Sequence, residues 1–321
     1  MTRRTWGAKA GDRRPNDPKL ETVVGGVALA NPIMTASGTS GHGAELDAYF
    51  PLRDLGAVVV KSLSADPWPG NPAPRLHEAG LSMLNSVGLQ GPGIAAWLTD
   101  DMPALQRARA RVVVSIWGRS VEDYEKAAIA LAGAPDDIIA VEVNLSCPNL
   151  DGGAHLFAQS PSDTGAAIRA VLAAVGRPVW AKLTAHVTSI TEIAEAATAA
   201  GASALTITNT MLGLAIDPET RRPVLGAGGG GVSGPGIHPI AVRAIHDVHT
   251  AVPDVSIVGV GGVSSGLDAV EMLLAGASAV QVGTATFADP RAPVRVLGEV
   301  REWCRRHGVM SVREILGGMD G

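Results

Sequence analysis

The stretch RVVVSIWGRSVEDYEKAAIALAGAPDDIIAVEVNLS (residues 111–146) carries a strand, a helix and a second strand in succession. The continuous apolar run Val112–Val114 predicts a strand at Arg111–Ile116, a second β-rich run predicts a strand at Ile139–Ser146, and an amphipathic pattern predicts a helix at Val121–Leu131. Strands without polar alternation are typical of a sheet that is covered on both faces. The stretch therefore predicts two parallel strands joined by a crossover helix.

The same alternation continues on both sides of this unit. The other candidate strands are Ile33–Ala36, Ala57–Ser62, Pro178–Leu183, Ala204–Asn209, Val255–Gly259 and Ala279–Gly283. The other candidate helices are Asp163–Val175, Ile190–Ala200, Pro239–Thr250, Gly266–Leu274 and Pro293–His307. Eight strands in this order predict an α/β chain folded as a (β/α)8 TIM barrel. No internal repeat or low-complexity linker divides the chain, so we expect one domain over residues 1–321.

An open doubly wound sheet is the alternative that the same alternation allows. Gly226, Gly228 and Gly231 formally satisfy the dinucleotide-binding pattern GxGxxG, but they follow the loop segment PETRRPVLG rather than a strand. The acidic residue expected about 20 residues further on is missing, since Asp247 falls within a predicted helix. The match is interpreted as accidental, which favours the barrel.

Composition excludes several classes of function. The 26 Lys and Arg against 31 Asp and Glu give a net charge of −5 without a basic stripe, which argues against nucleic acid as a partner. No apolar run is long enough to span a membrane, and residues 1–18 lack the apolar stretch of a secretory signal, so we expect a cytoplasmic protein. Two cysteines, Cys147 and Cys304, are too few for a disulfide framework, a four-thiolate metal site or an iron–sulfur cluster, and we expect no bound metal.

Polar residues cluster at the ends of the candidate strands, where barrel enzymes carry their catalytic groups. The side chains in these positions are Ser37, Lys61, Ser115, Asn144, Lys182, Asn209 and Thr210. The last two strands end instead in Gly261-Gly262 and Gly283-Thr284, a pattern typical of phosphate binding by backbone N–H groups. Because buried lysines need an anionic partner, Lys61 and Lys182 also indicate an anionic ligand.

Cys147 lies just beyond a predicted strand, in the polar turn NLSCPN (144–149). A free cysteine is most often a small buried apolar residue, and this interpretation is adopted for Cys304 in the last predicted helix. The position of Cys147 favours a base, because a thiolate near positive charge can accept a proton.

Ten motifs of this chain resemble those of the class 1 dihydroorotate dehydrogenases, class 1B in particular. They are NPIMTASGTSG (31–41), VVKS (59–62), GNPAPR (70–75), MLNSVGLQGPG (83–93), VEVNLSCPN (141–149), AKL (181–183), TNTMLGLAIDPETRRPVLG (208–226), GVSGPGIHPIAVR (231–243), GVGGV (259–263) and VGTA (282–285). The resemblance implies oxidation of dihydroorotate to orotate in pyrimidine biosynthesis. In that reaction Cys147 would remove the C5 proton while a hydride leaves C6 for FMN.

The resemblance also implies roles for individual residues. The implied substrate contacts are Lys61, Asn85, Ser86, Val87, Gly88, Leu89, Asn144, Asn209 and Thr210. The implied FMN contacts are Ser37, Lys61, Ser62, Ser115, Asn144, Lys182, Thr208, Gly234, Gly261, Gly262, Gly283 and Thr284. Some positions depart from the pattern of the family: Ser115 where Asn is expected, Trp68, Trp117, His186 and the tract GAGGGG (226–231).

Class 1B further implies a partner subunit that carries FAD and a two-iron two-sulfur cluster and passes electrons to NAD. Since flavin barrels often pair, a homodimer is also implied. Three alternatives remain open: a fumarate-dependent enzyme of class 1A, a flavin enzyme resembling dihydropyrimidine dehydrogenase, and a barrel that binds FMN without catalysis. Asn149, where dihydropyrimidine dehydrogenases have His, favours dihydroorotate as substrate.

Overall fold

A computed structural model describes residues 17–146 and 156–319. Within these residues, eight strands form one sheet in the order β3, β16, β15, β10, β9, β8, β7 and β4. Their bounds are β3 (Ile33–Thr35), β4 (Val58–Val59), β7 (Val112–Ile116), β8 (Ile138–Asn144), β9 (Val179–Lys182), β10 (Ala204–Ile207), β15 (Ser256–Val260) and β16 (Ala279–Val282). All neighbouring strands in this order are parallel.

The two strands at the ends of this order, β3 and β4, also meet. Met34 and Ala57 form a parallel bridge, and the Val59 N–H donates a hydrogen bond of 2.9 Å to the Thr35 hydroxyl. The sheet is therefore closed on itself, and the predicted TIM barrel is confirmed. The alternative of an open doubly wound sheet is wrong.

Helices follow the strands and pack against the outside of the barrel, where apolar side chains of both form the larger hydrophobic core. The helices are α1 (Ile94–Asp100), α2 (Met102–Arg107), α3 (Val121–Ala130), α4 (Pro161–Val175), α5 (Ile190–Ala199), α6 (His238–Ala251), α7 (Gly266–Leu274), α8 (Ala285–Ala288) and α9 (Ala292–Arg306). Short 3-10 turns lie at Glu45–Ala48, Leu52–Asp54, Phe157–Gln159, Pro235–Ile237 and Val312–Ile315. Among the described residues, no helix combines the length and apolar character needed to cross a bilayer.

Local sequence signals fix where several helices begin and end. The hydroxyl groups of Ser120, Ser160, Ser189 and Ser265 each accept a hydrogen bond from the N–H three residues further on. This satisfies one of the free N–H groups of each first turn. Gly176 ends α4 in the left-handed conformation, as expected for a glycine after a last turn.

A hairpin of β1 (Thr22–Val24) and β2 (Val27–Leu29) covers the N-terminal end of the barrel. Val24, Val27 and Leu29 are buried against side chains from inside the barrel, including Val113 and Trp180. The barrel is thus closed at this end by apolar packing, which leaves the opposite end for polar chemistry.

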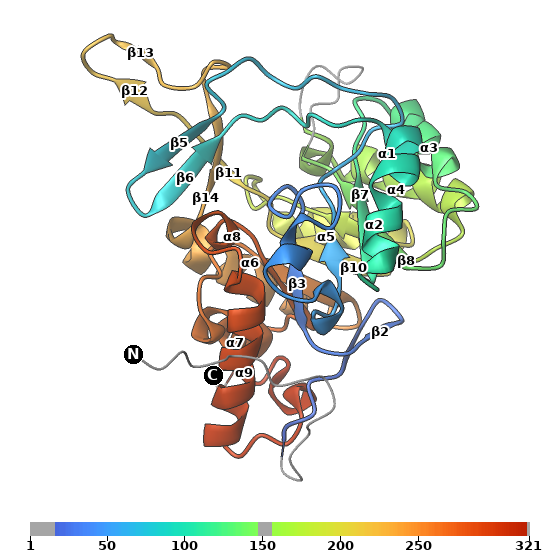
Figure 1. Cartoon of the computed structure of the whole chain (residues 1–321), viewed down its shortest axis with the longest axis vertical. Coiled ribbons are helices and arrows are strands. Elements are labelled where there is room, and N and C mark those ends of the chain that lie inside the picture. The colour runs from blue at the N-terminus through green and yellow to red at the C-terminus, as the bar shows by residue number, and fades with distance from the viewer. Residues whose placement is uncertain (1–16, 147–155, 320–321) are drawn as a thin grey trace.

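A second sheet, which the sequence did not predict, lies beyond the C-terminal ends of the strands. It is antiparallel and consists of β5 (Leu76–Ala79), β6 (Ser82–Asn85), β11 (Met211–Gly213) and β14 (Gly230–Ser233), in the order β11, β14, β6, β5. Figure 1 shows it at the upper left, with the small hairpin of β12 (Ile216–Asp217) and β13 (Arg222–Pro223) beside it. Its strands come from the connections after β4 and after β10, so it covers part of the catalytic face.

The predicted strand at Ala57–Ser62 is shorter in the structure, where β4 spans only Val58–Val59. Beyond β4 the N–H of Lys61 donates to the carbonyl of Gly41, in the loop after β3, and Leu63 then returns to β7 through a parallel bridge with Ile116. This loop contact places Lys61 at the mouth of the barrel.

Candidate active site

A chain of hydrogen bonds joins the ends of four barrel strands. The hydroxyl groups of Ser62 and Ser115 are 2.9 Å apart, the Asn144 amide donates to Ser62 at 3.3 Å, and the Asn209 amide donates to Asn144 Oδ1 at 3.0 Å. These residues follow or end β4, β7, β8 and β10. Four residues predicted as site residues are therefore brought together in one buried or half-buried network.

Backbone contacts fix the orientation of the two asparagines in this network. The N–H of Thr210 donates to Asn209 Oδ1 at 2.8 Å, and the N–H of Ser146 donates to Asn144 Oδ1 at 3.3 Å. The hydroxyl of Tyr124, in α3, donates to the backbone carbonyl of Asn144 at 2.7 Å. Held in this way, the amides can present a defined pattern of donors and acceptors to a ligand.

Lys182 lies at the end of β9, the strand between β8 and β10, where it pairs in register with Asn144. Its ammonium donates to the Ser37 hydroxyl at 2.9 Å and lies 3.6 Å from Glu142 Oε1. The Lys182 side chain is only 4% exposed, and that of Glu142 is fully buried. The contact with Ser37 brings two of the predicted FMN contacts together.

Glu142 was not singled out from the sequence, nor were its partners Thr206 and Gln281. Its Oε2 accepts hydrogen bonds from Thr206 Oγ1 at 3.1 Å and from Gln281 Nε2 at 2.9 Å. All three residues are fully buried. A signal was present in the sequence, because a carboxylate in the middle of the apolar strand IIAVEVN has to face a polar partner inside the barrel.

Lys61 stands half-buried beside the network. Burial, and to a smaller extent the charge of Arg75, lower the pKa of its ammonium below the ordinary lysine value. Among residues 17–146 and 156–319, no hydrogen bond or ion pair to its side chain is found. A partly desolvated cation in this position suits an anionic ligand.

The segment Asn85–Leu89, predicted to cradle the substrate, is held by an extended stretch that precedes β5. The N–H of Asn71 donates to Val87 O at 3.1 Å, and its amide donates to Ser86 O at 3.1 Å. The indole N–H of Trp68 donates to Gly88 O at 3.0 Å. Leu89 has a positive φ of 61°, and the buried hydroxyl of Ser86 has no hydrogen-bond partner among residues 17–146 and 156–319.

The glycine tract, whose role was unexplained in the sequence, lies against the substrate segment. A Cβ on Gly230 would lie 2.2 Å from the carbonyl oxygen of Asn85, and a Cβ on Gly231 would lie 2.1 Å from Thr210 Oγ1. The Asn85 amide also donates to Gly231 O at 3.1 Å. Glycine lets β14 approach two of the predicted substrate residues closely.

The predicted phosphate site combines Gly234, Gly261, Gly262, Gly283 and Thr284. Gly261 and Gly262 have positive φ angles of 131° and 72°, and a Cβ on Gly262 would lie 2.6 Å from the Cβ of His238. The Thr284 hydroxyl donates to Ser233 Oγ, next to Gly234, at 2.8 Å. The glycine pair after β15 thus packs directly against the start of α6, and a helix start next to free backbone N–H groups suits the phosphate of a flavin nucleotide.

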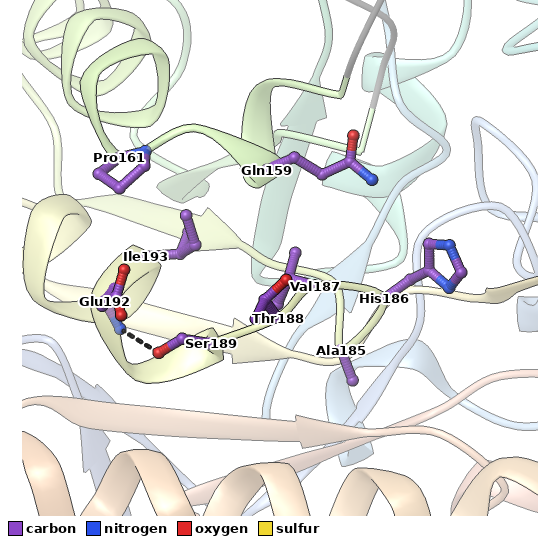
Figure 2. A pocket seen from close by; sticks show the side chains of 9 residues that line it. All are labelled: Gln159, Pro161, Ala185, His186, Val187, Thr188, Ser189, Glu192 and Ile193. Atoms are coloured by element: carbon purple, nitrogen blue, oxygen red, sulfur yellow. Dashed lines mark hydrogen bonds between the residues drawn. The ribbon is translucent and has the colours of Figure 1, made fainter.

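A cavity of about 520 Å³ lies at the rim, between the start of α4 and the loop after β9. Figure 2 shows Gln159 and Pro161 on one side and the loop residues Ala185 to Ser189 on the other, with His186 among them. The predicted site residues that lie within the described part of the chain do not line it. Thr208 is adjacent in the fold, since its hydroxyl accepts a hydrogen bond from the Ala185 N–H at 2.7 Å.

Of the two cysteines, Cys147 lies outside the described residues. Cys304 lies in α9 and is fully buried. Burial, followed by the charge of Glu314, raises the pKa of its thiol, which makes it a poor nucleophile or base. Its position agrees with the interpretation as a structural residue.

Comparison with known proteins identifies the family. The family model for dihydroorotate dehydrogenase matches residues 19–303. The catalytic subunit of dihydroorotate dehydrogenase B (NAD(+)) from Alkaliphilus oremlandii is 44% identical over 294 residues, which cover 92% of this chain and 96% of that relative. The subunit of the same name from Geobacter metallireducens is 41% identical over 303 residues, which cover 94% and 99%. The chain belongs to the dihydroorotate dehydrogenase family.

Proposed function

We propose that this protein oxidises dihydroorotate to orotate in pyrimidine biosynthesis, as the FMN-binding catalytic subunit of a dihydroorotate dehydrogenase of the NAD-linked type. The observation that carries the proposal is the hydrogen-bonded set Ser62, Ser115, Asn144 and Asn209 at the barrel mouth, with Lys61 and Lys182 beside it. Relatives that match nearly the whole chain bear that name, which supports the same assignment.

FMN bound at this mouth would supply a hydride acceptor for C6 of the substrate. Gly234, Gly261, Gly262, Gly283 and Thr284 are proposed to hold its phosphate, and Ser37, Ser62, Ser115, Lys182 and Thr208 its ring and side chain, together with Lys61 and Asn144. The ammonium of Lys182 would stabilise the negative charge that the ring gains on reduction.

The substrate is proposed to bind between the asparagine network and the segment Asn85–Leu89. The Lys61 ammonium would pair with its carboxylate, and the amides of Asn144 and Asn209 would satisfy the donors and acceptors of the pyrimidine ring. Asn85 to Leu89 and Thr210 would complete this set of contacts. Cys147 is proposed to accept the C5 proton as a general base, so that the proton and the hydride leave neighbouring carbons.

Electrons would then pass to a partner subunit with FAD and a two-iron two-sulfur cluster, and from there to NAD. The two named relatives are called catalytic subunits, which supports the existence of such a partner. We propose further that the chain forms one FMN-binding domain, pairs as a homodimer and acts in the cytoplasm.

An anaerobic experiment tests the assignment. The chain is purified alone, its visible spectrum is recorded, and dihydroorotate or, in a separate sample, dihydrouracil is added. NAD or fumarate is then offered to the reduced protein. Bleaching of the flavin by dihydroorotate, with neither acceptor restoring the colour, is the expected result. Reoxidation by fumarate would instead indicate class 1A, bleaching by dihydrouracil alone would indicate another pyrimidine substrate, and bleaching by neither would indicate a barrel without this activity.

A further inference from the structure

A buried carboxylate stands directly behind Lys182, and the proposed mechanism gives it no role. Glu142 is fully buried in β8, and its Oε1 lies 3.6 Å from the Lys182 ammonium. In the part of the chain that the structure describes, it is the one carboxylate within 4.0 Å of this ammonium. Removing both charges from water is costly, so a pair in this position needs a reason beyond stability.

Hydrogen bonds from two other strands hold the carboxylate in place. Thr206 in β10 and Gln281 in β16 both donate to Oε2, whereas Oε1 accepts no hydrogen bond from the described residues and faces the ammonium. One oxygen is thus anchored to the barrel, and the other is aimed at Lys182. The ammonium has its second contact at the Ser37 hydroxyl, on the far side of the barrel mouth.

We infer that Glu142 is a positioning residue that holds Lys182 beside the flavin and lowers the reduction potential of that flavin by partly balancing the lysine charge. The inference rests on the proposed function, in which Lys182 contacts the FMN ring. Reduction adds negative charge to the ring, which a cation stabilises and an anion opposes. Glu142 would therefore moderate the effect of Lys182 and keep the reduced flavin able to pass electrons onward.

The reduction potential of the bound FMN tests this inference without measuring turnover. The holoprotein and its Glu142→Gln variant are reduced at equilibrium in the presence of a reference dye that exchanges electrons with the flavin. The variant is expected to show an equilibrium constant for reduction at least about tenfold larger, which is about 30 mV for a two-electron couple. An unchanged or a lower potential in this variant would overturn the inference.

Two further variants separate charge from structure. Thr206→Val removes one hydrogen bond to the same carboxylate but leaves its charge, so it should lower thermal stability while moving the potential much less than Glu142→Gln. Glu142→Asp keeps the charge but withdraws it from Lys182, and a smaller rise of the potential is expected. If Glu142→Gln does not fold, absence of any rise in Glu142→Asp contradicts the inference.

Lys182→Met distinguishes failure of the inference from failure of the proposed function. This variant should bind FMN with a lower potential, because it removes the cation from the ring. A lower potential in Lys182→Met with no change in Glu142→Gln would refute the role of Glu142 and leave the proposed function standing. If the protein binds no FMN, or if the reduction potential of its FMN is the same in Lys182→Met as in the unmodified protein, both the inference and the proposed function are wrong.

Discussion

The side-chain amide of Asn209 donates a hydrogen bond of 3.0 Å to Asn144 Oδ1 and so joins the ends of β10 and β8. Each asparagine is also fixed by a backbone N–H, from Thr210 and from Ser146. The two side-chain amides are therefore held in one orientation without a ligand. Preorganised amides of this kind bind a ring of alternating donors and acceptors without having to be ordered first.

Replacing Asn209 by Ala should weaken the binding of orotate about 10- to 100-fold, because Asn144 Oδ1 loses the hydrogen bond donated by Asn209 and a contact to the ligand is lost as well. The FMN content should not change. Titration of the flavin spectrum with orotate measures the affinity. Asn31→Ala is the matched control, since Asn31 is buried at the opposite end of the barrel, where its amide donates to Asp54 O at 2.9 Å. This control should lower the melting temperature but not the orotate affinity. If both variants lose the same amount of orotate affinity, the effect of Asn209→Ala is due to reduced stability alone.

The two cysteines should respond in opposite ways. Cys147→Ala should keep FMN but slow flavin reduction by dihydroorotate at neutral pH at least ~10²-fold, the usual size of a general-base contribution. Cys304→Ala should leave the reduction rate nearly unchanged, because this thiol is buried in α9 and its pKa is raised. Stopped-flow absorbance gives both rates. Near-normal reduction by Cys147→Ala would remove that residue from the mechanism.

The sequence predicted the barrel well because its strands are short apolar runs that alternate with amphipathic helices. The residues at strand ends, such as Asn144, Lys182 and Asn209, could be predicted for the same reason, since the position of a strand end fixes the face of the barrel. Glu142 was not predicted as a site residue although it interrupts an otherwise apolar segment. The rule that catalytic groups lie at strand ends does not apply to polar side chains inside the barrel.

The antiparallel sheet above the barrel could not be predicted from local patterns. β5 is exposed along its whole length, and β14 is rich in glycine, so neither shows an apolar alternation. Their pairing joins segments that are far apart, as in the contact between Asn85 and Gly231 across 146 residues of sequence. Of the glycines in the GxGxxG pattern, Gly226 packs against the backbone of Ala73, Gly228 has a positive φ of 85°, and Gly231 packs against the Thr210 side chain.

Substitution of Gly230 tests that packing. A Cβ there would meet the backbone oxygen of Asn85, which cannot rotate away, so β14 or the substrate segment has to shift. Gly230→Ala should weaken orotate binding at least about 10-fold, the size expected when about one hydrogen bond to the ligand is misplaced.

Gly298→Ala is the control, because Gly298 lies in α9 and a Cβ there would meet nothing within 4 Å among the described residues. It should stabilise the protein by about 0.5–1 kcal/mol and leave orotate affinity unchanged. Normal affinity in Gly230→Ala would mean that Asn85 does not contact the substrate.

The pKa of Lys61 predicts how orotate binding depends on pH. Burial and the charge of Arg75 lower this pKa, so the ammonium loses its proton at a lower pH than an exposed lysine does. Orotate affinity should be constant below the Lys61 pKa and fall about tenfold per pH unit above it. Arg75→Gln removes one of the two causes and should shift the start of this fall to higher pH. Lys61→Arg should abolish it, because a guanidinium stays charged throughout the range. If Lys61→Arg binds orotate and still loses affinity at the same pH as the unmodified protein, the titrating group is not Lys61, and the proposed ion pair with the substrate carboxylate is wrong.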